Sequence, residues 1–75
     1  MSIDIGMLWF TNDAHKSLAD KVMDAVNYYS KKYGASPDLV HVHPDMVDKS
    51  EPHIRVIVDD SIQIGHLWIG IDNES

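Results

Sequence analysis

The chain has 75 residues, no cysteine and a formal net charge of −6, from 12 Asp and Glu against 6 Lys and Arg. This length accommodates one small domain, residues 1–75, with a marginal core, and the missing cysteines exclude disulfide bridges and thiolate metal sites. The acidic balance disfavours nucleic acid, and the chain shows neither the ~20-residue apolar run of a membrane span nor the basic start of a signal peptide. We therefore expect a cytoplasmic domain.

The first predicted element is a strand from Ile3 to Phe10. Residues of both parities are partly apolar: Ile3, Ile5, Met7 and Trp9 on one side, and Asp4, Gly6, Leu8 and Phe10 on the other. This pattern indicates a strand that is covered on both sides towards its end.

The segment from Asp13 to Gly34 is the one long periodic stretch and predicts an α-helix. Its apolar residues recur at helical spacing, at Leu18, Val22, Ala25, Val26, Tyr29 and Tyr33. We expect this stripe to form the helical side of the core. Asn12 or Asp13 is expected to cap the first turn, and Gly34 to supply the left-handed C-cap.

Three apolar segments after the helix predict strands. They run from Asp38 to His43, from His53 to Val58 and from Ile62 to Ile71, with a loop at Pro44–Pro52, a turn at Asp59–Ser61 and a frayed polar tail at Asp72–Ser75. The resulting order β-α-β-β-β predicts an α+β fold, a two-layer sandwich of one helix on a four-stranded mixed sheet. We expect the first two strands to be parallel and the last three to form an antiparallel meander.

A two-residue hairpin at Asp60–Ser61 would set the register of this meander. It would place Arg55 opposite His66 and His53 opposite Trp68, and closing the longer loop would place His41 opposite Arg55.

Alternation along these strands predicts two chemically different faces of the sheet. One face carries Val40, Val42, Ile54, Val56, Val58, Leu67, Ile69 and Ile71, and is expected to meet the helix. The other carries His41, His43, His53, Arg55, His66 and Trp68, with Leu39, Ile57 and Ile64 beside them. This histidine-rich face admits three interpretations: an ordinary solvated sheet face, an association surface, or a metal or catalytic site.

We expect a small non-catalytic interaction or self-assembly domain that binds another protein or a second copy of itself through this face, with no cofactor. Exposed Trp and Arg are typical of contact surfaces. The alternative is a histidine-based metal-binding protein or small hydrolase, with zinc held by His41, His43, His53 and His66. The cationic Arg55 among these imidazoles disfavours a metal, so we expect the face to respond to pH before it responds to metal.

Overall fold

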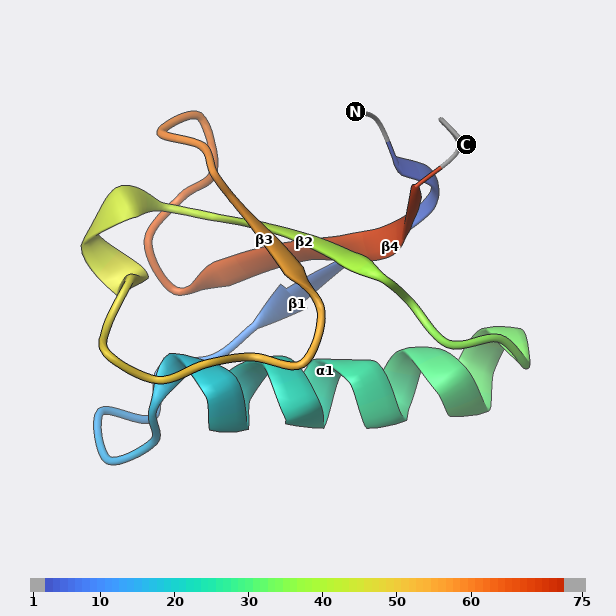
Figure 1. Cartoon of the computed structure of the whole chain (residues 1–75), viewed down its shortest axis with the longest axis horizontal. Coiled ribbons are helices and arrows are strands. Elements are labelled where there is room, and N and C mark those ends of the chain that lie inside the picture. Colours follow the sequence, from blue (N-terminus) through green and yellow to red (C-terminus); the bar gives the residue numbers. More distant parts are fainter. Residues whose placement is uncertain (1–2, 73–75) are drawn as a thin grey trace.

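The computed structural model describes residues 3–72, apart from the side chain of Asp4. Its elements are β1 (Ile3–Phe10), α1 (Leu18–Tyr33), β2 (Leu39–Val42), a short 3-10 helix η1 (Pro44–Met46), β3 (Arg55–Val58) and β4 (His66–Asp72). The four strands form one mixed sheet and α1 lies along one face of it (Figure 1). The predicted two-layer α+β fold and its β-α-β-β-β order are confirmed, and β1 has the predicted bounds.

The strand order in the sheet is β1-β4-β2-β3. The last strand therefore lies between the first two, and it is antiparallel to both β1 and β2. β1 and β2 run in the same direction, as predicted, but they do not pair with each other. β3 pairs with β2 in parallel, so the predicted antiparallel meander was wrong.

The predicted hairpin between the last two strands was also wrong. The chain turns through backbone hydrogen bonds from Ile62 to Asp59 and from His66 to Gln63, and β4 begins only at His66. His41 consequently lies opposite Trp68 and Ile57, and neither His66 nor His41 faces Arg55. The two strands differ in length: β4 has seven residues and pairs on both sides, whereas β3 has four and pairs with β2. The longer strand takes the centre of the sheet, where Leu67, Ile69 and Gly70 are buried.

The helix begins later than predicted. Ser17 is its N-cap and its hydroxyl accepts a hydrogen bond from the Asp20 amide at 3.2 Å, whereas the Asp13 carboxylate accepts from His15 in the preceding turn. The C-terminus is as predicted, because Gly34 caps it in the left-handed conformation with φ of 72°. The predicted tail was wrong at Asp72, which ends β4; residues 73–75 lie outside the described part of the chain.

The connection from β2 to β3 crosses from the sheet to the start of α1 (Figure 1). The Asp48 carboxylate accepts a hydrogen bond from the Leu18 amide at 2.7 Å, and the Ser50 hydroxyl accepts one from the Ala19 amide at 2.9 Å. Hydrogen bonds from the Ser50 hydroxyl and the Leu18 amide lower the pKa of Asp48. Parallel pairing requires a connection of about a dozen residues that leaves the sheet, and here that connection also satisfies free amides of the helix.

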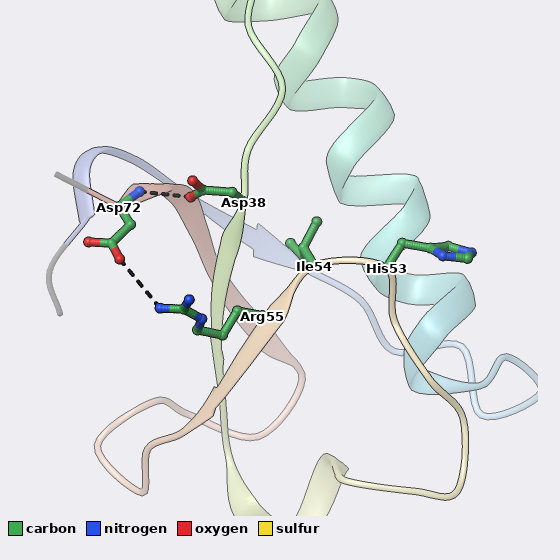
Figure 2. Close-up of a pocket in the computed structure, with 5 residues that line it drawn as sticks. All are labelled: Asp38, His53, Ile54, Arg55 and Asp72. Carbon is green, nitrogen blue, oxygen red and sulfur yellow. Dashed lines mark hydrogen bonds and ion pairs between the residues drawn. The ribbon is translucent and has the colours of Figure 1, made fainter. Parts of the chain in front are cut away.

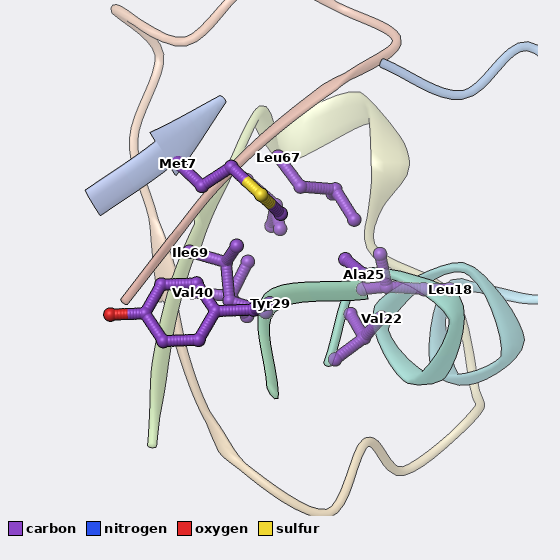
Figure 3. Close-up of a cluster of buried hydrophobic side chains, with 9 residues drawn as sticks. Met7, Leu18, Val22, Ala25, Tyr29, Val40, Leu67 and Ile69 are labelled. Atoms are coloured by element: carbon purple, nitrogen blue, oxygen red, sulfur yellow. The ribbon is translucent and has the colours of Figure 1, made fainter. Parts of the chain in front are cut away.

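The core lies between α1 and the sheet (Figure 3). Its buried members are Met7, Leu18, Val22, Ala25, Tyr29, Val40, Val42, Leu67 and Ile69, with Trp9, Val26, Met46, Ile54, Val56 and Ile71 packed against them. The predicted helical stripe and aliphatic sheet face are therefore largely confirmed. The exceptions are Tyr33 at the helix end and Val58 at the sheet edge, which are 39% and 56% exposed. The buried Tyr29 hydroxyl donates a hydrogen bond of 2.7 Å to the Ile5 carbonyl, beside the irregularity in β1.

Substitutions in the helical stripe test this core. Val22→Asp should abolish folding, because an unpaired carboxylate would be buried, and Leu18→Ala should lower the free energy of unfolding by about 2–5 kcal/mol. Asn27→Ala, at an exposed position of the same helix, is the control and should leave stability nearly unchanged. Thermal melts followed by circular dichroism measure all three. If the Val22→Asp and Leu18→Ala variants melt like the parent, these two residues do not belong to the core.

Candidate functional site

The sheet surface that faces away from α1 forms the candidate site, which we call the open face. It carries Leu8, Phe10, Leu39, His41, Arg55, Ile57, His66 and Trp68. One row crosses all four strands, because Leu8 pairs with Trp68, Trp68 with His41, and His41 with Ile57. Neighbours of these residues along the strands, such as Met7, Leu67 and Val40, point to the helix and are buried. The open face is therefore a continuous surface of mixed apolar and imidazole side chains.

Glycine allows the Trp68 ring to lie close over β1 at Gly6. A Cβ atom added at Gly6 would collide with the Trp68 ring, and one added at Gly70 would collide with the Ile3 side chain and with backbone of β1. Leu39 pairs with Gly70 and is completely buried, although it does not belong to the main core. These residues form a small second apolar layer on the open face.

The imidazole of His66 is held beside Phe10. The two residues are register partners, and their ring centroids lie 5.0 Å apart at 55°. The His66 Nδ1 atom is buried and has no hydrogen-bond partner within residues 3–72. His66 therefore contributes to the open face as a packed aromatic ring.

His41 is held by an acidic partner from the turn after β3. Its Nδ1 lies 3.1 Å from Asp59 Oδ2, and the Ser61 hydroxyl and amide donate to Asp59 Oδ1 at 2.6 Å and 2.9 Å. The hydrogen bond from the Ser61 hydroxyl, followed by the one from His41, lowers the pKa of Asp59 to about 2. This contact fastens the end of β3 to β2.

A carboxylate on Nδ1 is the arrangement that orients a general-base histidine in hydrolases. The other ring nitrogen would then have to reach a substrate or a nucleophile. The Nε2 atom of His41 instead has less than 1 Å² of accessible surface and no hydrogen-bond partner in the described part of the chain. The His41 ring therefore links β2 to the turn after β3, and its Nε2 atom is not accessible to a substrate.

Two of the predicted site residues lie outside the strands, in the connection between β2 and β3. His43 caps the short helix η1, where its Nδ1 accepts a hydrogen bond of 3.0 Å from the Asp45 amide. His53 lies in the connection before β3 and is exposed. Figure 2 shows its side chain pointing away from Arg55 and Asp72. Of the four histidines predicted to cluster, His41 and His66 therefore lie in strands of the open face, whereas His43 and His53 lie in the connection between β2 and β3.

Arg55 lies at the opposite end of the open face from His66. Its guanidinium is 3.6 Å from Asp72 Oδ2, and the Asp72 amide donates to Asp38 Oδ1 at 2.8 Å (Figure 2). A shallow pocket of about 270 Å³ lies here, lined by Asp38, His53, Ile54, Arg55 and Asp72. Arg55 therefore joins the start of β3 to the end of β4 across β2, in place of its predicted role beside the histidines.

The geometry of these imidazoles does not assemble a metal centre. Among residues 3–72 no group of three or more His, Asp or Glu side chains is placed to hold a metal ion. Asp59 and the Asp45 amide already bind the Nδ1 atoms of His41 and His43.

Two residues that sequence reasoning left out complete the site. Leu8 and Phe10 of β1 lie on the open face and are 57% and 59% exposed. Both parities of this strand are apolar, so its pattern could not assign a side to either residue. The signal that could have found them is the pair of glycines, Gly6 and Gly70, that allows β1 and β4 to pack closely.

Comparison with protein-family models, curated proteins and solved structures finds no significant match. Across the described range of the chain, α1 is too short and too polar to span a lipid bilayer, and η1 is shorter still.

The Asp59 contact predicts a specific pH dependence of stability. Because folding lowers the pKa of Asp59 from 3.8 to about 2, the ionised carboxylate stabilises the fold above about pH 4, and this contribution is lost as the pH falls towards 2. Asp59→Asn should therefore be less stable than the parent at pH 6, and the difference should shrink between pH 4 and pH 2. Urea titrations across this range measure it.

Asp60→Asn is the matched control, because Asp60 is the exposed neighbour of Asp59. Its stability should follow the parent at every pH. A difference between Asp59→Asn and the parent that stays constant down to pH 2 would contradict the assigned role of the carboxylate.

Proposed function

We propose that this protein is a non-catalytic self-association domain whose contact surface is the open face. Exposure of large apolar side chains carries the proposal. Leu8, Phe10 and Ile64 are 57%, 59% and 57% exposed. Soluble monomers seldom leave adjacent large apolar side chains in water, and such patches are typical of contact surfaces.

The apolar patch continues beyond the sheet. Phe10 and Ile64 line one shallow pocket of about 510 Å³ together with Val47 and Met46. Val47 is 49% exposed. A partner that covers Leu8 and Phe10 would also seal this pocket, so the buried surface would be contiguous across the strand and the neighbouring loops.

The polar side chains of the open face are paired within the protein or buried, which supports binding without catalysis. His41 and Arg55 bind Asp59 and Asp72, and the buried nitrogens of His41 and His66 are closed to a substrate. His41 and His43 each already use a ring nitrogen within the protein, which disfavours metal binding. Trp68 and Arg55 supply the residue types enriched at interaction hot spots.

We also propose that the domain acts in the cytoplasm and that its partner is a second copy or another protein. The chain has no cysteine, which suits a reducing compartment. A core this small gains stability when an exposed apolar surface is covered.

Sedimentation of matched variants tests the proposal. The parent should sediment as a dimer at high micromolar concentration, and Phe10→Lys should shift it to monomer, because a charge would be buried at the contact. Val58→Lys is the control, since Val58 is similarly exposed, at 56%, but lies on the opposite edge strand. It should remain dimeric. A monomeric parent, or a Phe10→Lys variant as dimeric as the parent, would overturn the proposal.

A further inference from the structure

We infer that two copies associate by antiparallel pairing of their β1 strands about a two-fold axis at Leu8, which extends the sheet from one copy into the other. This inference rests on the proposed self-association and names its contact. It makes the backbone of one edge strand, and not only the side chains of the open face, the recognition element.

The hydrogen-bonding direction of β1 follows from its pairing with β4. The Thr11 amide donates to the Gly65 carbonyl at 2.7 Å, so alternate residues Met7 and Trp9 also bond towards β4. The Gly70 carbonyl accepts a hydrogen bond from the amide of Asp38, just before β2, so it points away from β1, as this alternation requires. The backbone N–H and C=O groups of Gly6, Leu8 and Phe10 therefore point away from the sheet. Within residues 3–72 no strand pairs with this edge.

Beyond the irregularity at its start, the β1 edge lacks the devices that normally protect a free edge. From Gly6 to Phe10 it contains no charge and no proline, and its register with β4 is regular. The other edge strand, β3, has four residues, begins with Arg55 and is followed by Asp59 and Asp60. Charged, short edges resist strand addition, whereas long apolar edges accept it. Addition is therefore expected at β1 and not at β3.

Charge and symmetry indicate a second copy as the occupant. Each chain carries a formal net charge of −6, so two copies can approach closely only where the contact itself is neutral, and the segment from Gly6 to Phe10 is neutral. An antiparallel two-fold axis also makes the edge complementary to itself. The outward N–H of Leu8 in one copy then faces the outward C=O of Leu8 in the other.

A register centred on Leu8 uses every backbone N–H and C=O group that points outwards between Gly6 and Phe10. It pairs Gly6 of one copy with Phe10 of the other, and the irregularity between Ile3 and Gly6 ends the pairing there. The Trp68 ring lies over Gly6. Phe10 of the second copy would therefore contact Trp68, and an aromatic ring opposite an edge glycine covers the backbone that the glycine leaves bare.

A backbone-specific pair of variants tests the edge contact. Leu8→Pro removes the outward N–H and should cost no hydrogen bond to β4, because that amide points away from the sheet. It should weaken dimerisation about tenfold more than Leu8→Ala, which removes the side chain but keeps the N–H. Sedimentation equilibrium gives both constants, and circular dichroism verifies the fold. Equal dimerisation constants for two folded variants would overturn the edge pairing.

Amide hydrogen exchange of the parent gives a second readout that needs no variant. The amides of Leu8 and Phe10 should exchange more slowly at dimeric than at monomeric concentration, while the outward amides of Val56 and Val58 on β3 should not change. A dimer in which Leu8 and Phe10 exchange freely would refute the edge pairing and leave the proposed function standing. A monomer at every concentration would refute both.

Discussion

The insertion of β4 between β1 and β2 is the constraint on which the rest of the structure depends. β4 supplies Leu67 and Ile69 to the core and is paired on both sides. Its glycine at position 70 lies against β1, and no side chain larger than hydrogen fits there. Because the last strand occupies the centre, the first strand becomes an edge, and β3 lies at the other edge, where it pairs with β2 in parallel.

The faces of the strands could be predicted from the sequence, whereas their order could not. Side chains alternate between the two faces of a strand, so Val40 and Val42 point to the helix whichever strand lies next to β2. The prediction of which residues form the aliphatic face was therefore largely correct, although the predicted register was wrong. Strand order depends on which segment gains most from burial, and Asp60–Ser61 resembled a hairpin turn locally.

The helix cap and the histidine cluster were wrong for different reasons. Ser17 competed locally with Asn12 and Asp13 for the cap, and its hydroxyl accepts the Asp20 amide. The Leu18 and Ala19 amides are bound by Asp48 and Ser50, far along the chain, and no local motif indicates those contacts. The cluster of four histidines required β3 to pair with β4. Once those strands separate, His53 lies in a connecting loop, and His41 finds Asp59 as its partner.

The most direct test of this account is the pairing of β4, measured by nuclear Overhauser contacts between α-protons across strands. In antiparallel sheets, directly opposite residues of non-hydrogen-bonded pairs bring their α-protons close together. The account predicts such contacts between Leu8 and Trp68 and between Val40 and Ile69. A contact between β3 and the segment before β4, such as Ile57 with Ile64, would contradict this strand order. β4 would then pair with β3, and β1 would no longer have to be a free edge.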